Sequence, residues 1–206
     1  MIYPEFNNLK VENRLGVSPV GEDTRMIARR VAELSFDHAL EVGTGTGFVI
    51  LYLASLGRAC EGTDISSDAV DCCLTNAAAN GLEVRFYLSD LFENVAGLFD
   101  LIVFNPPYGH SRSGRWDRPL AIIKSLLPKE NRWFSALIYQ MIRKERRHLI
   151  CYFLDAAREH LSEGGSVIIV LRHNELDLLS GETHEVIDEL NQQRLVRWQP
   201  GSKDKR

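Results

Sequence analysis

The chain has 206 residues, 45% of them hydrophobic and 25% charged, and a formal net charge of −4, a composition typical of one folded globular domain. No apolar run reaches the roughly 20 residues of a membrane-spanning helix, and the first residues lack the regions of a secretory signal, so we expect a cytoplasmic protein without membrane contact. The four cysteines and six histidines show no metal-ligand spacing, so no metal site is expected.

Strand and helix patterns alternate along the chain. In chain order they predict a strand at 38–43, a helix at 48–57, a strand at 58–65, a helix at 68–81, strands at 83–90 and 98–105, a helix at 148–165, a strand at 166–171, a helix at 182–193 and a strand at 194–199. Such alternation implies right-handed crossovers. We therefore expect an α/β fold, a Rossmann-like, doubly wound and mostly parallel sheet with helices on both faces.

The stretch EVGTGTG, residues 41–47, joins the first predicted strand to its helix. Its glycines allow a tight turn and a close approach of backbone to a ligand. Dinucleotide-binding loops use G-x-G-x-x-G, whereas this loop reads G-x-G-x-G with Phe48 after it, which disfavours a nicotinamide-dependent oxidoreductase. A plain strand-to-helix turn is the alternative interpretation.

Acidic residues stand at the ends of three successive predicted strands. Glu41 lies in the first, Asp64 ends the second and Asp90 ends the third. The carboxyl ends of parallel strands form the ligand-binding edge of open α/β sheets, and a carboxylate at the position of Asp64 is suited to ribose hydroxyls. The alternatives are structural: Asp64 caps the following helix, and Asp90 holds a turn.

Five segments together resemble one family. EVGTGTG, GTDISSDAV, TNAAANGL, LSDLFENV and FDLIVFNPPY follow in order the pattern of class I S-adenosylmethionine-dependent methyltransferases. The Asn-Pro-Pro-Tyr sequence is similar to the branch of HemK/PrmC-like glutamine N-methyltransferases and adenine-N6 methyltransferases. Residues 38–108 carry the resemblance, and residues 21–31 look like the helix that precedes the core in the shorter glutamine enzymes.

The resemblance implies S-adenosyl-L-methionine as the cofactor. Glu41 would then hold the methionyl ammonium, Asp64 the ribose and Asp90 the adenine amino group, while Ile65 and Leu91 flank the adenine ring. The cofactor carboxylate would meet backbone N–H groups near the helix N-terminus. The loop residues that the resemblance assigns to the cofactor are Gly43, Thr44, Gly45 and Gly47.

The Asn-Pro-Pro-Tyr stretch then has a chemical purpose. A planar nitrogen is a poor nucleophile, and its N–H groups need two acceptors, which Asn105 Oδ1 and the Pro106 carbonyl can supply. Both hydrogen bonds strengthen as positive charge develops on nitrogen. Tyr108 offers a flat face for the planar group. A rigid turn after a strand is the alternative.

Positive charge is concentrated after this motif. Residues 109–148 hold ten lysines and arginines against three acids, a net charge of +7 that leaves −11 for the rest. We expect Arg112, Arg115 and Trp116, together with Pro107, to bind the substrate. A solvated surface is the alternative. The predicted substrate is a macromolecule, through a protein glutamine or an adenine N6 of RNA or DNA.

We divide the chain into an N-terminal extension (1–20), a methyltransferase domain (21–200) with a basic insertion (109–148) and a disordered tail (201–206). The C-terminal region looks too short for both final strands of a seven-stranded sheet. We expect the last strand to be missing, or to come from another segment, a partner subunit or a homodimer. A catalytically silent, cofactor-binding scaffold subunit is therefore the rival function.

Overall fold

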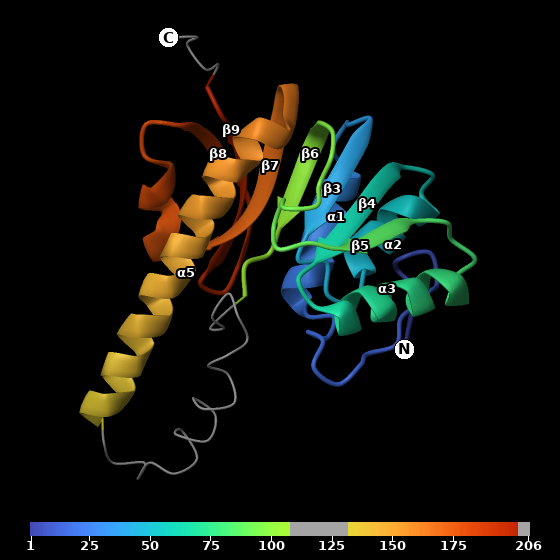
Figure 1. The fold of residues 1–206 in the computed structure, drawn as a ribbon, viewed down its shortest axis with the longest axis horizontal. Helices are drawn as coiled ribbons and strands as arrows, with labels where there is room; N and C mark the ends of the chain where they lie inside the picture. Colours follow the sequence, from blue (N-terminus) through green and yellow to red (C-terminus); the bar gives the residue numbers. More distant parts are fainter. Residues whose placement is uncertain (108–131, 202–206) are drawn as a thin grey trace. The chain divides into compact units, whose positions relative to one another are not determined.

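The computed structural model describes residues 1–107 and 132–201, with side chains given for 1–107 and 144–201 (Figure 1). The chain divides into two compact units. The first contains Met1–Asn105 and the chain from Ala156 onward, and the second contains Pro106–Asp155. The predicted disordered tail lies almost wholly outside the described residues.

A seven-stranded sheet organises the first unit. Its order is β5-β4-β3-β6-β7-β9-β8 (Figure 1). The first five are parallel neighbours, whereas β9 pairs antiparallel with both β7 and β8. The strands are β3 (His38–Val42), β4 (Ala59–Asp64), β5 (Arg85–Leu88), β6 (Phe99–Phe104), β7 (Leu161–Arg172), β8 (Thr183–Leu190) and β9 (Gln193–Gln199). The predicted mostly parallel, doubly wound sheet is confirmed.

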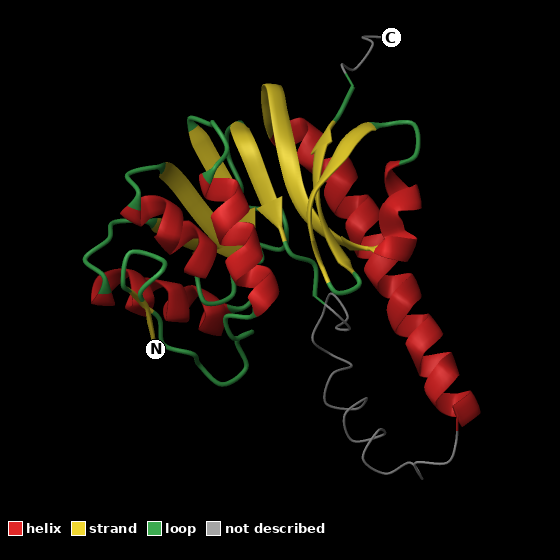
Figure 2. Cartoon of the chain, turned by 180° about the vertical axis from the view of Figure 1, so that it is seen from behind, coloured by secondary structure: helices red, strands yellow, loops and turns green. Residues whose placement is uncertain are grey.

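Three helices cover one face of this sheet (Figure 2). They are α1 (Glu22–Ala32), α2 (Phe48–Ser55) and α3 (Ser67–Ala79). Helix α2 contacts both α1 and α3, and buried side chains of all three share one core with β3, β6, β7 and β9. Ser66 caps α3, since its Oγ accepts from the Ala69 amide at 3.4 Å.

The first residues of the chain contribute to the same core. Strands β1 (Ile2–Tyr3) and β2 (Leu9–Lys10) form a small antiparallel hairpin. Its Phe6 side chain is fully buried and makes edge-to-face contacts with Phe48 and Tyr52 of α2, with ring centroids 4.9 Å apart in both pairs.

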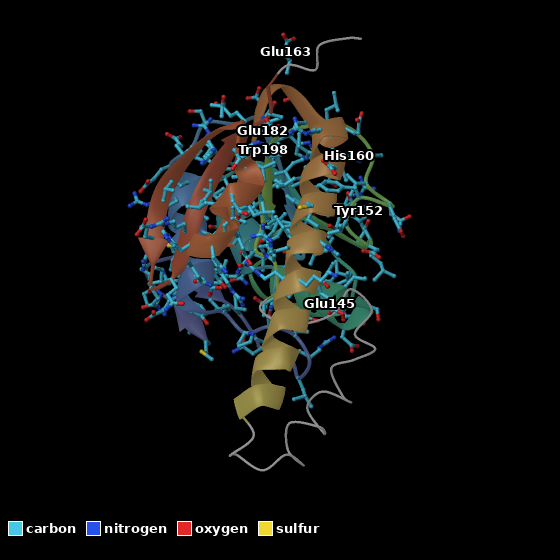
Figure 3. The ribbon with its side chains drawn as sticks, turned by 90° about the vertical axis from the view of Figure 1, so that its left-hand side faces the viewer. Glu145, Tyr152, His160, Glu163, Glu182 and Trp198 are labelled. Atoms are coloured by element: carbon cyan, nitrogen blue, oxygen red, sulfur yellow. The ribbon has the colours of Figure 1, made fainter. Side chains whose placement is uncertain are left out.

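The last residues of helix α5 (Arg132–His160) belong to the first unit. The Arg158 guanidinium donates a hydrogen bond to Glu182 and lies 4.8 Å from the ring centroid of Trp198; both partners are labelled in Figure 3. The His160 ring stacks on Phe92 at 4.7 Å. The last turn of α5 thus packs against β9 at Trp198, a buried residue outside the core that α1, α2 and α3 share.

Two expectations about the C-terminal region are wrong. Residues 182–193, predicted as a helix, instead form β8 and a turn. Strand β8 is the seventh strand of the sheet, so the expectation that the C-terminal region is too short for both final strands is also wrong. No partner subunit is needed to complete the sheet. The turn between β8 and β9 consists of two residues, and Asn191 adopts φ 57°, the left-handed conformation typical of a tight hairpin. A short 3-10 helix, η1 (His173–Leu179), connects β7 to β8.

Helix α5 and strand β7 meet earlier than predicted. The helix ends at His160, and β7 begins at Leu161 rather than at 166. A register shift between Phe99 and Leu101 marks an irregular pairing beside the two glycines at 164–165. Glycines after a helix predict its end, but here they lie inside a bulged strand. Within the described residues, we find no helix with the length and apolarity required to cross a membrane.

Candidate active site

The carboxyl ends of four neighbouring strands place the predicted site residues at one rim of the sheet. Val42 of β3 lies opposite Thr63 of β4 and opposite Phe104 of β6. Asp64 in turn lies opposite Leu88 of β5. The segments that follow these strands, including the glycine loop and Asn105, therefore begin side by side.

Backbone hydrogen bonds fix the glycine loop to β4. The amides of Gly43 and Thr44 both donate to the Thr63 carbonyl, at 2.8 and 2.9 Å. The loop ends at Gly47, whose φ of 79° favours glycine. A Cβ there would lie 3.1 Å from Cys73 Sγ and 3.3 Å from Phe86 Cζ. The glycine therefore serves both backbone conformation and close packing against α3 and β5.

Glu41 is a buried acid beneath this loop. Its side chain is 4% exposed, and Thr44 Oγ1 donates to its Oε2 at 2.7 Å. Burial raises the pKa of Glu41 to about 8, while the Thr44 hydrogen bond opposes the shift and the nearby Asp64 charge adds to it. The structure thus brings Glu41, Thr44 and Asp64 together.

Asp64 links the glycine loop to the start of α3. Its Oδ2 accepts from the Gly45 amide at 3.0 Å, and its Oδ1 accepts from the Ser66 amide at 2.9 Å. The helix itself is capped by Ser66, so a capping role does not account for Asp64. Each carboxylate oxygen has two acceptor sites, so both retain capacity for a further donor such as a hydroxyl group.

The segment after β5 runs beside Asp64. The Ser89 amide donates to the Asp64 carbonyl at 2.9 Å, which brings Asp90 and Leu91 to the same rim. Leu91 is buried and has φ 50°, whereas Ile65 is 52% exposed. Ser89 was missed by the sequence analysis: it is buried, and its Oγ donates to the Leu91 carbonyl at 2.9 Å and thereby holds the turn.

Asn105 is held at the end of β6 by a residue of α1. Its Nδ2 donates to Asp23 Oδ2 at 2.9 Å. Its Oδ1 is buried and has no hydrogen-bond partner among the described residues. Because a carboxylate only accepts, Asp23 dictates which end of the amide faces it. Asp23 was not predicted from the sequence, although it is one of the two acids in the stretch GEDT, residues 21–24.

The two prolines after Asn105 belong to the second unit. Arg146 of α5, itself 3% exposed, donates to the Pro106 carbonyl and, at 2.9 Å, to the Pro107 carbonyl. The predicted second acceptor for a substrate therefore already accepts from a guanidinium. The Pro106 carbonyl oxygen has a second lone pair, which can accept a hydrogen bond from a substrate N–H group. Its role as a substrate acceptor therefore stays a prediction. Arg146 was not singled out by the sequence.

Four predicted site residues, Tyr108, Arg112, Arg115 and Trp116, lie outside the described residues. Among the residues that the structure does describe, no three histidine, cysteine, aspartate or glutamate side chains gather as metal ligands would.

The sequence matches the family model of the methyltransferase small domain over residues 16–126, more than half of the chain. A Methanocaldococcus jannaschii protein provisionally named a protein N5-glutamine methyltransferase is 36% identical over 105 residues, which cover 50% of this chain and 53% of that protein. The release factor glutamine methyltransferase of Haemophilus influenzae is 34% identical over 123 residues, covering 50% of this chain and 42% of that enzyme. The chain thus spans about half the length of these relatives.

Among solved structures, the Thermus thermophilus 16S rRNA N2 G1207 methyltransferase in complex with AdoMet and guanosine has a similar fold. The two superpose with a TM-score of 0.58 at 19% identity, covering 93% of this chain and 42% of that one. At this identity the likeness concerns the fold alone.

Proposed function

We propose, from the premise that this chain belongs to the methyltransferase small domain family, that it transfers a methyl group from S-adenosylmethionine to a planar nitrogen of a macromolecule. The observation that carries the proposal is the buried Oδ1 of Asn105, which lacks a partner among the described residues at the end of β6. A buried acceptor without a donor is costly, so such an atom indicates a position that a ligand fills.

The residues of the first unit fit the proposed cofactor. S-adenosylmethionine carries no phosphate, and the loop of Gly43, Gly45 and Gly47 offers backbone rather than a lysine side chain. The remaining acceptor capacity of Asp64 suits ribose hydroxyls, and Ile65 presents an exposed apolar side chain for a planar base. When bound, the cofactor supplies an activated methyl group on a sulfonium.

Asn105 would act on the acceptor nitrogen. Its Oδ1 accepts an N–H of the planar amide or amine and holds the nitrogen toward the methyl donor. The nitrogen gains positive charge as the new bond forms, so the same hydrogen bond is stronger in the transition state than in the ground state. No strong base is required, since the methylated nitrogen becomes acidic and releases its proton readily.

The acceptor we favour is a glutamine side-chain amide of a protein, because both relatives described above carry that activity in their names. A base of RNA or DNA is the competing acceptor. Both are planar nitrogens with two N–H groups, so the described residues serve either one.

The test uses tritium-labelled S-adenosylmethionine and an extract of source cells that lack this gene, so that the acceptor sites are unmethylated. Incorporation is followed with the wild-type protein, with Asn105→Ala and with Asn7→Ala, an exposed asparagine on the N-terminal hairpin, as matched control. Calorimetry measures cofactor binding for each. We expect Asn105→Ala to lower the rate by about 10²- to 10³-fold with unchanged cofactor affinity.

Fractionation of the labelled extract identifies the acceptor. Counts that protease releases and ribonuclease leaves in place support a protein amide, whereas the reverse supports a nucleic-acid base. Incorporation that does not depend on Asn105 would overturn the proposal in favour of a silent scaffold. Calorimetry with a nicotinamide dinucleotide tests the oxidoreductase alternative.

A further inference from the structure

Asp23 and Asn105 come from distant parts of the chain, 82 residues apart, and meet through a single hydrogen bond from Nδ2 to Oδ2 of 2.9 Å. We infer that Asp23 is a positioning residue: its carboxylate orients the Asn105 amide so that Oδ1, and not Nδ2, faces the acceptor nitrogen. This inference rests on the proposed function, because it assigns to Asp23 a role in the same reaction.

The two ends of an asparagine amide have nearly the same shape and exchange by a half-turn of the terminal torsion. In the reversed orientation an NH2 group would point at the N–H groups of the substrate, donor against donor. The reversed amide would also direct its oxygen at the Asp23 carboxylate, acceptor against acceptor. An ionised carboxylate therefore favours one orientation, which a neutral amide at position 23 cannot do.

The first turn of α1 leaves room for this carboxylate. A Cβ on Gly21 would lie 2.4 Å from Asp23 Oδ1. Gly21 has φ −97°, which any residue adopts, so its backbone conformation does not require glycine. The constraint is the space beside Asp23, because the carboxylate would have to move to admit a Cβ at position 21. A side chain at position 21 would displace the carboxylate that Asn105 contacts.

If Asp23 served only to stabilise helix α1, its replacement would have the same effect as the replacement of Glu22. Acids in the first turn of a helix stabilise it through the helix dipole, and α1 has two, Glu22 and Asp23. Glu22 is exposed, whereas Asp23 is half-buried against Asn105. Loss of either charge should affect the helix similarly, but only loss of the Asp23 carboxylate should affect the orientation of Asn105.

The test compares Asp23→Asn with Glu22→Gln, each of which removes one negative charge from the same helix turn. Rates of tritium incorporation are measured at saturating extract and saturating cofactor, and S-adenosylmethionine binding by calorimetry. We expect Asp23→Asn to lower the saturated rate about 10- to 100-fold while the dissociation constant stays within about twofold, and Glu22→Gln to match the wild type. Asp23→Glu, which retains the carboxylate, should recover part of the rate.

Gly21→Ala provides a second variant in which every polar group is retained. It should lower the saturated rate in the same direction, and combined with Asp23→Asn it should add little, because both act through the same hydrogen bond. An independent readout comes from the NMR signals of the Asn105 side-chain NH2, assigned with Asn105→Ala. These signals should shift in Asp23→Asn and Gly21→Ala and stay in place in Glu22→Gln.

The outcomes separate this inference from the proposed function. If the wild-type protein transfers no label, the proposed function fails, and the NMR shifts still test the contact between the two side chains. If the wild type is active and Asp23→Asn keeps its saturated rate, the inference is overturned. A loss of cofactor affinity in parallel with the rate would also overturn it, since that result indicates a structural role.

Discussion

Thr44 Oγ1 donates a 2.7 Å hydrogen bond to Glu41 Oε2, and both side chains are buried at the carboxyl end of β3. The bond favours the ionised form of the acid, but loss of hydration around the carboxylate outweighs it, and the pKa of Glu41 rises to about 8. The site thus contains an acid that holds its proton through neutral pH when no cation lies beside it.

This raised pKa predicts a pH-dependent stability. The folded protein keeps the Glu41 proton up to a pKa of about 8, whereas the unfolded chain releases it near 4.5. Between these values the folded state binds more protons, so the free energy of unfolding should fall as the pH rises, by up to about 1.4 kcal/mol per pH unit. Urea denaturation from pH 5 to 8 should show a flatter profile for Glu41→Gln. Equal slopes for the two proteins would contradict the prediction.

Asp64 should govern cofactor affinity. Asp64→Asn places an NH2 group against the amide of Gly45 or Ser66, so one of the two hydrogen bonds is lost and the glycine loop is no longer held. We expect the free energy of unfolding to fall by about 1–3 kcal/mol and S-adenosylmethionine affinity to fall at least about tenfold. Asp68→Asn, at an exposed position in the first turn of α3, removes the same charge. It should leave the affinity unchanged in calorimetry and lower the free energy of unfolding by at most about 0.3–1 kcal/mol, the contribution of an acid at a helix N-terminus.

Replacement by alanine should destabilise the protein more at Gly47 than at Gly57, which has a similar φ but open space around it. Gly57 has φ 76° and no atom within 4 Å of an added Cβ, so Gly57→Ala should cost only the backbone term, about 1–2 kcal/mol. Gly47→Ala adds contacts with Cys73 and Phe86 at 3.1–3.3 Å and should cost at least about 1 kcal/mol more. Similar denaturation midpoints for both variants would show that packing around Gly47 is unimportant.

Arg146 should stabilise the second unit. Its buried guanidinium donates to the carbonyls of Pro106 and Pro107, so Arg146→Met leaves both without this donor. We expect a loss of about 2–3 kcal/mol in the free energy of unfolding. Lys144→Met removes a charge at an exposed position of the same helix and should stay within about 0.5 kcal/mol of the wild type in urea denaturation. An equal loss in both variants would point to net charge as the cause.

The helix predicted at 182–193 shows where local pattern failed. Its glutamates and spaced apolar residues fit a helix, and a register shift between Val186 and Asp188 interrupts the alternation that would have indicated a strand. Pairing with β9 overrides the helical propensity, and Arg30 of α1 binds Asp188 of this strand at 2.7 Å. Asn191, which lies in the turn between β8 and β9, was the local feature of the sequence that indicated a hairpin.

The sequence by itself determined the order of elements from β3 to β6, the glycine loop and the acids at the strand ends, because periodicity and turn chemistry are local properties. It also indicated the family, since those segments follow one another at recognisable spacing. Only the tertiary structure decided that Asp23 meets Asn105, that Arg146 meets Pro106 and Pro107, and that β8 is a strand. Each of those depends on hydrogen bonds between residues brought together by folding, whose partners no local pattern can specify.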